Sequence, residues 1–253
     1  MKQRLISAIV ALIIVVPLVI FGGIWFEIAV SILGLLAMRE VLKLKNVPKS
    51  ISIISLILVP ILIFLDIDVI NKVLFTLIIY FILLVFYDRK EYNIENCTFL
   101  TAFASLIIVV FTEFYVIREA NLNVFLYLFM ITILTDTFAY IGGRLFGKHK
   151  LIESVSPNKT IEGSVIGSFI GTILPTAFYV FMINPGESIV IAFIITLILS
   201  IIGQLGDLVF SSIKRYYDIK DYSNIMPGHG GILDRLDSII FVMMGYIVIL
   251  SIL

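Results

Sequence analysis

Long runs of apolar residues alternate with short polar segments along the whole chain. A helix that crosses a membrane needs roughly 20 residues, and fewer when interfacial residues complete it. Each apolar run is predicted to be a helix, because an open strand would leave backbone groups unpaired in lipid. The predicted spans are 5–22, 24–42, 51–66, 69–87, 99–117, 123–145, 160–183, 188–213 and 232–253. The pattern therefore predicts an all-α, polytopic integral membrane protein with about nine transmembrane helices.

The distribution of charge predicts how these helices are oriented. With the N-terminus in the cytoplasm, all of the 18 basic residues except Lys72 and Arg118 fall at cytoplasmic ends or loops. The predicted outer loops carry acidic residues instead, namely Asp66, Asp68, Glu119 and Glu187. Cytoplasmic loops of membrane proteins carry an excess of lysine and arginine. We therefore expect a protein of the cell (inner) membrane with a cytoplasmic N-terminus and its polar chemistry on the cytoplasmic face.

Composition supports a membrane protein built as one domain. Apolar residues make up 60% of the chain and charged residues 14%, against roughly 25% charged in a soluble domain. The single cysteine, Cys97, excludes an internal disulfide and a cysteine-based metal site. Lys2 and Arg4 before the first apolar run would also suit a signal peptide, but no small-residue cleavage site follows, so we expect a retained first helix. No internal repeat is visible, and residues 1–253 are interpreted as one membrane domain.

The densest polar chemistry lies in Gly203–Asp237, between two strongly apolar segments. Its acids are Asp207, Asp218, Asp221, Asp234 and Asp237, and its bases are Lys214, Arg215, Lys220 and Arg235. Carboxylates beside lysines, arginines and a glycine turn indicate a metal ion that holds a polyphosphate. Lys214 and Arg215 would also suit a plain cytoplasmic anchor of the preceding helix.

Three carboxylates fall inside or at the edge of apolar segments. Asp136, Asp207 and Glu162 are functional hypotheses, because an ionised carboxylate within a span costs a few kcal/mol or more. The alternative is an interfacial acid satisfied by a neighbouring base, or for Glu162 an acid at a helix N-terminus. Gln204 and Ser211 share the helix face of Asp207, which gives a polar stripe. Other acids, Glu27, Glu40 and Glu113, are interpreted as interfacial charges with no chemical role.

Two short segments are predicted to be turns that contact a ligand. Ser156–Thr160 is interpreted as a turn that enters a helix, with the turn fixed by Pro157 and the helix capped by Thr160. Free N–H groups there, beside Lys159, would form an anion site, although an ordinary polar loop is the alternative. Gly228–Gly231 is a flexible turn that lets the backbone approach a ligand. Within it, His229 either contacts phosphate or nucleotide or has no role; His149 is expected to have none.

The residues of the polar segment also carry a family resemblance, fixed in spacing over 27 residues from 211 to 237. The matching positions are Ser211, Ile213, Lys214, Arg215, Lys220, Asp221, Ser223, Pro227, His229, Gly230, Gly231, Ile232, Asp234, Arg235, Leu236 and Asp237. This pattern resembles the signature of the phosphatidate cytidylyltransferase (CDP-diacylglycerol synthase) family. Met226 is a mild departure, since it stands where Leu, Ile or Phe is usual.

A second segment upstream is similar to the same enzymes. Its matching positions are Asp136, Thr137, Ala139, Tyr140, Gly143, Arg144, Gly147 and Lys148, followed by Ser156–Thr160, Glu162 and Gly163. The resemblance therefore covers about the C-terminal half of the chain. Residues 131–253 are interpreted as the catalytic half, whereas residues 1–130 match only as generic transmembrane helices.

The resemblance implies that CTP and phosphatidate give CDP-diacylglycerol and pyrophosphate, with Mg²⁺. A second cation that clamps the attacking and leaving oxygens is an open alternative. It implies that Asp207 and Asp234 hold the metal, with Asp237 and Asp136 as weaker ligand candidates. Lys214, Arg215 and the three acids Asp207, Asp234 and Asp237 form the implied catalytic set. The implied substrate-binding residues are Asn158, Lys159, Ser211, Lys220, Asp221, His229, Gly230, Arg235 and Arg144. Charge neutralisation and alignment would be most of the catalytic task, and no covalent nucleophile is needed.

Two other functions stay open at this point. A related CTP-dependent transferase, such as a polyprenol kinase or an ether-lipid cytidylyltransferase, would share the chemistry but act on another lipid. A transporter would also place charges within spans, but here the charges gather at one membrane face and the halves show no repeat. The expected partners are CTP, phosphatidic acid and membrane lipids, with no nucleic acid. A homodimer is an open alternative, because the sequence does not determine the oligomeric state.

Overall fold

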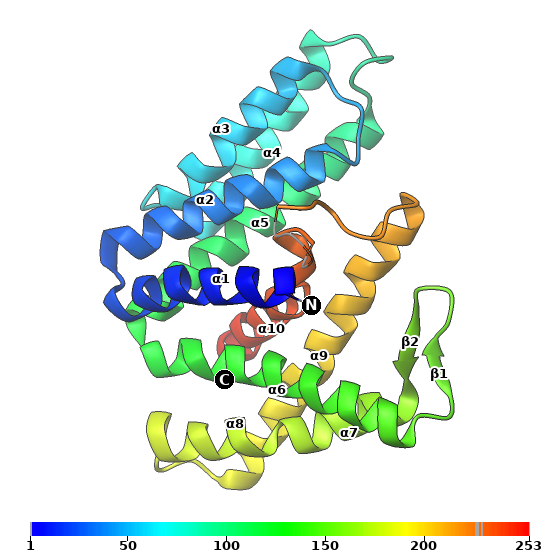
Figure 1. Cartoon of the computed structure of the whole chain (residues 1–253). Helices are drawn as coiled ribbons and strands as arrows, with labels where there is room; N and C mark the ends of the chain where they lie inside the picture. Colours follow the sequence, from blue (N-terminus) through cyan, green and yellow to red (C-terminus); the bar gives the residue numbers. More distant parts are fainter. Residues whose placement is uncertain (1, 226–227, 229, 253) are drawn as a thin grey trace. The chain divides into compact units, whose positions relative to one another are not determined.

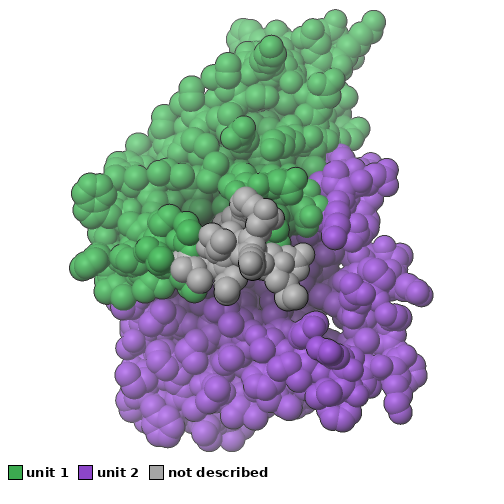
Figure 2. Space-filling model, in the orientation of Figure 1, with its two compact units in different colours: residues 1–119, 221–234 green, residues 120–220, 235–253 purple. Residues whose placement is uncertain are grey.

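The computed structural model describes residues 2–225, 228 and 230–252, and most of them are helical. Contacts between Cα atoms divide the chain into two compact units, which are coloured separately in Figure 2. Unit 1 comprises Met1–Glu119 and Asp221–Asp234, and unit 2 comprises Ala120–Lys220 and Arg235–Leu253. The polar segment 203–237 therefore contributes to both units, and each unit is described separately below.

Unit 1 consists of apolar helices and the returning segment 221–234 (Figure 1). The helices are α1 (Lys2–Phe21), α2 (Gly23–Leu42), α3 (Lys49–Phe64), α4 (Val69–Phe86) and α5 (Ile94–Ala120). Side chains from α2, α3 and α5, including Met38, Ile51 and Ile108, are fully buried. Gly34 of α2 allows a close approach, because a Cβ there would lie 2.3 Å from the Ile63 side chain of α3.

Both basic residues that departed from the predicted charge pattern have internal partners in unit 1. Lys72 is 2% exposed, and its ammonium donates to the Ile63 carbonyl and the Thr112 hydroxyl, each at 3.1 Å. Arg118 donates to the carbonyls of Val19 and Ile20, at 2.8 and 2.6 Å. These carbonyls belong to the last turn of α1, where no intrahelical partner is available. Lys72 and Arg118 thus bind groups inside the protein. This explains why they do not follow the rule that basic residues lie in cytoplasmic loops.

Unit 2 consists of α6 (Leu122–Phe146), β1 (Lys150–Ile152), β2 (Ser156–Thr160), α7 (Ile161–Gly171), α8 (Ile173–Phe178), the π-helical turn η1 (Tyr179–Ile183), α9 (Ile189–Tyr216) and most of α10 (Leu233–Ile252). Glycines at every fourth position of α7 bring it close to α6. A Cβ on Gly163 would lie 2.6 Å from the Ala139 carbonyl, and one on Gly167 would lie 2.7 Å from the Thr135 carbonyl. Gly171 continues this face. Small residues with this spacing are typical of closely packed membrane helices.

The segment Ser156–Thr160 corrects the sequence-based interpretation. It is an extended strand that pairs antiparallel with β1, in the register Lys150↔Thr160 and Ile152↔Ser156, and it is not a turn. Proline fixes φ near −65° and is tolerated on an edge strand, so Pro157 is compatible with this conformation. The predicted helix cap is confirmed, because the Thr160 hydroxyl accepts a bond from Gly163 N at 3.1 Å. Apart from this hairpin, the described residues are helical or lie in connecting segments.

Each predicted span coincides with helical structure, but nine crossings are not confirmed. Within the described residues, six helices are long and apolar enough to cross a membrane. They are Val69–Phe86, Ile94–Ala120, Leu122–Phe146, Ile161–Ile183, Ile189–Tyr216 and Leu233–Ile252. Large apolar side chains such as Val85 (82% exposed) lie on the outside of these helices. Such a surface is expected of a protein in lipid, where apolar side chains need no burial.

Candidate active site

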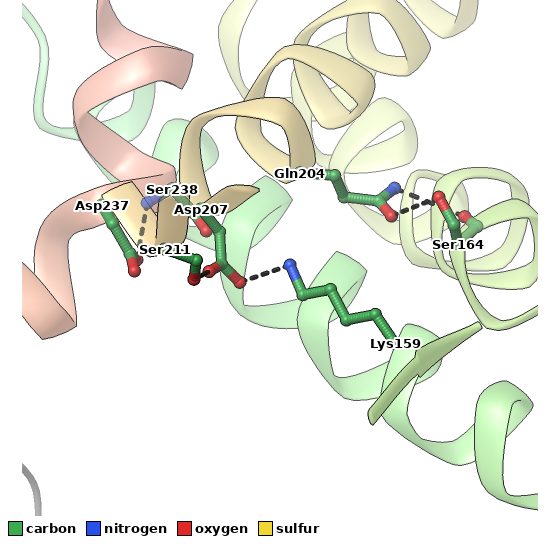
Figure 3. Close-up of polar contacts among 7 residues, drawn as sticks. All are labelled: Lys159, Ser164, Gln204, Asp207, Ser211, Asp237 and Ser238. Atoms are coloured by element: carbon green, nitrogen blue, oxygen red, sulfur yellow. Dashed lines mark hydrogen bonds and ion pairs between the residues drawn. The ribbon is translucent and has the colours of Figure 1, made fainter. Parts of the chain in front are cut away.

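Asp207 of α9 is the centre of the polar arrangement in unit 2 (Figure 3). Its carboxylate accepts a hydrogen bond from the Ser211 hydroxyl to Oδ1 at 3.1 Å. The Lys159 ammonium contacts Oδ2 at 2.5 Å. The predicted polar stripe is therefore present, since Asp207 and Ser211 lie one helical turn apart on α9. The side chains of Lys159 and Asp207 are 29% and 24% exposed, so this ion pair is accessible from one side.

Lys159 reaches Asp207 because of the β1–β2 hairpin. The lysine is the next-to-last residue of β2, immediately before the Thr160 cap of α7. Extended backbone at the start of a capped helix fixes the direction in which the lysine side chain leaves the chain. Asn158, the neighbouring predicted substrate ligand, is exposed.

Gln204 anchors α9 to α7 on the same polar stripe (Figure 3). Its carbonyl oxygen accepts from the Ser164 hydroxyl at 2.7 Å, and its amide nitrogen donates to the Ser168 hydroxyl at 2.7 Å. Buried polar groups need such partners, because an unpaired one costs about 1–3 kcal/mol. The sequence indicated that Gln204 shares a face with Asp207 but did not reveal its serine partners. Gln204 thus fixes the helix that carries Asp207 without itself being exposed.

Two further acids of unit 2 lie within electrostatic range of Asp207. Asp136 of α6 and Asp237 of α10 both interact with the Asp207 charge, and Asp237 also interacts with Lys214. Asp237 additionally accepts a hydrogen bond from Ser238 N at 2.8 Å. A cluster of acids with few compensating bases attracts cations. Within the described part of the chain, however, no three His, Cys, Asp or Glu side chains converge closely enough to form a ready metal cage.

A narrow pocket lies beside Asp136. Its lining residues are Ile131, Thr132, Thr135, Asp136, Ser200, Gly203, Gln204, Ser238 and Val242, from α6, α9 and α10. The buried Ser238 hydroxyl lines it and has no hydrogen-bond partner among the described residues. Thr135 and Ser200 bond to each other at 2.8 Å across the same region. The interior beside Asp136 is therefore polar, although the helices around it are apolar.

The basic residues at the end of α9 differ in their surroundings. Lys214 is buried (9% exposed), whereas Arg215 is exposed. The Arg215 guanidinium donates to the Val155 and Ile219 carbonyls, each at 3.3 Å. It therefore links the hairpin to the end of α9. The predicted ligands Arg144 and Lys220 are exposed in unit 2.

In unit 1, Asp234 accepts hydrogen bonds from the backbone. Both Tyr222 N and Gly231 N donate to its Oδ2, at 2.8 and 2.9 Å. Gly230 has φ +89°, and a Cβ there would lie 2.8 Å from the same oxygen. Gly230 and Gly231 thus lie against the Asp234 carboxylate. Asp221 and Arg235 are exposed, whereas His229, Met226 and Pro227 lie outside the described residues.

Glu40 of α2 is the residue that sequence reasoning missed. It is fully buried, and its carboxylate accepts from the Ser223 hydroxyl at 2.6 Å. It also accepts from Ile232 N and Leu233 N, at 2.8 and 2.9 Å. The interpretation of Glu40 as an interfacial charge is therefore wrong. In the sequence, Glu40 lies near a basic helix end, and nothing there indicates that its partners are Ser223, Ile232 and Leu233.

This fold and the geometry of the site define a class of protein: a helical membrane protein whose site contains both acidic and basic side chains. The chain belongs to the cytidylyltransferase family, whose model matches residues 2–253. A phosphatidate cytidylyltransferase of Staphylococcus aureus (strain COL) is 38% identical over 255 residues, which cover 96% of each chain. A phosphatidate cytidylyltransferase of Staphylococcus haemolyticus (strain JCSC1435) is 39% identical over 251 residues, again covering 96% of each chain. The expected family resemblance is therefore confirmed, and it extends over the first 130 residues as well.

Proposed function

We propose that this protein is a phosphatidate cytidylyltransferase, which forms CDP-diacylglycerol and pyrophosphate from CTP and phosphatidic acid. Relatives of that name, similar over nearly the whole chain, support the reaction. The structural observation that carries the proposal is the accessible Lys159–Asp207 ion pair beside Ser211 in an otherwise apolar helical protein. Charged residues within a membrane protein cost free energy, so such a pair is interpreted as functional.

The reaction requires two anions to meet. A phosphatidate oxygen attacks the α-phosphorus of CTP, a new P–O bond forms, and the bond to the pyrophosphate oxygen breaks. Positioning and charge neutralisation supply most of the catalysis in phosphoryl-type transfers. Lys159, which contacts Asp207 from a partly exposed position, is suited to neutralise phosphate charge, and Lys214 is proposed to contribute from the end of α9. Arg215 donates to the backbone carbonyls of Val155 and Ile219 and is exposed, and it is proposed to bind phosphate from this position.

The acids near Asp207 could supply some of the ligands of a hard divalent cation, but among the described residues they do not form a complete coordination shell. Mg²⁺ is commonly held by one or two carboxylates, with phosphate oxygens and water completing its shell. Asp207, with Asp237 and Asp136 within electrostatic range, matches that description. When bound, Mg²⁺ would neutralise charge on the reacting phosphates. The assignment of Asp234 as a second ligand, and of a second cation, rests on the sequence resemblance alone.

We propose nine crossings, a cytoplasmic N-terminus and an active site that faces the cytoplasm of the cell membrane. The charge distribution over the nine predicted spans and the cytosolic location of CTP support this topology, and six of the helices are long and apolar enough to cross a membrane. Cys97 is buried and makes a poor probe, so cysteines are introduced at exposed positions. Lys90→Cys should react with a membrane-impermeant thiol reagent only from the cytoplasmic side, and Asp68→Cys only from the outside. The reverse pattern, or labelling of both from one side, would contradict this topology.

The proposed reaction is tested by the fate of two labels in CTP. Purified protein is incubated with Mg²⁺ and with CTP labelled at either the α- or the γ-phosphorus. The lipid acceptors are phosphatidate, a polyprenol and an ether-linked glycerophosphate lipid. We expect α-label in the lipid with phosphatidate as acceptor, and no γ-label in any lipid.

Each of the other outcomes would indicate a different function for this protein. Transfer of γ-label to polyprenol would indicate a kinase, and α-label in the ether lipid alone would indicate another cytidylyltransferase. An absence of label in every lipid, from properly folded protein, would contradict an enzyme of this class and leave a transporter.

A further inference from the structure

The buried carboxylate of Glu40 holds the start of α10 in unit 1. Ile232 N and Leu233 N lie at the beginning of that helix, where backbone N–H groups have no intrahelical partner. A carboxylate is favoured there both by hydrogen bonding and by the helix dipole. Glu40 is therefore a helix cap that is supplied by α2, far away in the sequence.

The same carboxylate also fixes the loop that precedes α10. The Ser223 hydroxyl donates to Glu40 Oε1 and accepts from Ile225 N at 3.4 Å. Ile232 N donates to the same Oε1. One oxygen of Glu40 therefore joins the two ends of the segment 223–232, which contains the glycine turn.

Gly231 shows how closely the backbone approaches this carboxylate. A Cβ on Gly231 would lie 2.3 Å from Glu40 Oε1, which is shorter than any real contact of a Cβ atom. Among the described residues, the donors to Glu40 are all neutral groups. A buried charge of this kind is tolerated only when its hydrogen bonds are satisfied, so the loop and the carboxylate depend on each other.

We propose that Glu40 is a positioning residue for cytidylyl transfer, which sets the conformation of residues 222–225 and 230–234 and thereby the place of Asp234. This inference rests on the proposed function, because the segment carries the residues that resemble the family signature. Glu40 itself touches no reacting atom. It acts through Ser223, Ile232 and Leu233, and it gives the N-terminal helices a role beyond spanning the membrane.

The test compares Glu40→Gln with Glu27→Gln. Both changes remove one acid from α2 and keep its size, but Glu27 has no hydrogen bond to this segment among the described contacts. The glutamine amide nitrogen cannot accept a hydrogen bond, so at least one donor to Glu40 loses its partner. In Glu40→Gln we expect a fall in kcat of about tenfold or more, and faster amide exchange at Ile232 and Leu233. Glu27→Gln should stay within about twofold of wild type in both measurements.

A structural role alone would give a different result. Lower yield or thermal stability, with wild-type kcat and amide exchange in the folded fraction of Glu40→Gln, would overturn the proposal. Gly231→Ala supplies a second test, because its Cβ must displace the Glu40 carboxylate. Glu40→Gln should then reduce activity little further in the Gly231→Ala background, as expected for residues that act through one contact. Fully additive losses would contradict the proposed contact.

The variants also separate this inference from the proposed function. If wild type transfers no cytidylyl group to phosphatidate, the proposed function fails, whereas amide exchange in both glutamine variants still tests the Glu40 contact. If wild type is active and Glu40→Gln matches it in kcat, only the positioning role fails. Should Glu40→Gln not fold, Ser223→Ala removes a single bond to Glu40 and should reduce kcat by about fivefold.

Discussion

Two carboxylates of unit 1, Glu40 and Asp234, are held in a different way from Asp207 of unit 2. In unit 1, Glu40 and Asp234 accept hydrogen bonds from backbone N–H groups, at 2.8–2.9 Å. In unit 2, Asp207 is contacted by the side chains of Lys159 and Ser211. Backbone donors cannot leave without refolding the loop, whereas a lysine can change partner by rotating its side chain. Glu40 and Asp234 are therefore suited to hold a loop in place. Asp207 is suited to exchange partners during a reaction.

This difference also bears on how a carboxylate in a signature should be interpreted. The resemblance to the family signature implies that Asp234 is a metal ligand. The structure adds a clear conformational role, since its Oδ2 closes the turn through Tyr222 N and Gly231 N. Loss of activity on mutation of Asp234 would therefore have two causes, and activity alone does not separate them.

Asp207→Asn should have the largest effect on activity. The change keeps the shape of the side chain and the bond from Ser211, but it removes the charge that faces Lys159. We expect cytidylyl transfer to fall about 10³-fold or more, as when a preorganised charge is removed from an active site. Initial rates at saturating CTP and phosphatidate measure the loss. Equal amounts of folded protein in the membrane are the control, and a rate within about tenfold of wild type would contradict the role of Asp207.

Lys159→Met should have an intermediate effect. Methionine keeps an unbranched apolar stem but removes the ammonium that contacts Asp207. We expect about 10–100-fold lower kcat/KM for CTP or phosphatidate, because phosphate neutralisation is lost while the acid remains. The matched control is Lys90→Met, which removes an exposed lysine of unit 1 that is interpreted as a topology anchor. Equal kinetics of the two variants would mean that Lys159 has only a structural role.

Ser211→Ala should have the smallest effect of the three. It removes one hydrogen bond, of 3.1 Å, from an accessible carboxylate that keeps its contact with Lys159. A loss of about fivefold in kcat corresponds to the ~1 kcal/mol of a single hydrogen bond. The matched comparison is Ser164→Ala, which removes the hydrogen bond from Ser164 to Gln204 on the same face of α9, and steady-state kinetics of the two variants distinguish the two contacts. A loss as large as that of Asp207→Asn would show that Ser211 contacts substrate directly.

Local sequence patterns predicted those features that depend on neighbouring residues. The helical segments follow from apolar runs, the shared face of Gln204, Asp207 and Ser211 follows from helical spacing, and the Thr160 cap follows from its side chain. The strand β2 was missed because it forms by pairing with β1, and Pro157 suggested a turn more strongly.

Contacts between distant residues were beyond this kind of reasoning. Lys159 and Asp207 are 48 positions apart, and Glu40 and Ile232 are 192 apart. Helical periodicity indicates which residues share a face, but it does not indicate which other helix that face meets. Glu40 therefore looked like an ordinary interfacial charge until its partners were placed beside it.

Amide hydrogen exchange in residues 222–233 tests the contrast between the two units most directly. The measurement compares Asp234→Asn and Asp207→Asn with wild type in the same membrane mimetic. Asp234→Asn should speed exchange at Tyr222 and Gly231 by about tenfold or more, because a charged acceptor of both N–H groups is lost. Asp207→Asn should leave this exchange unchanged although it abolishes activity, since its described contacts are side chains of unit 2. Unchanged exchange in Asp234→Asn, or equal acceleration in both variants, would contradict the account.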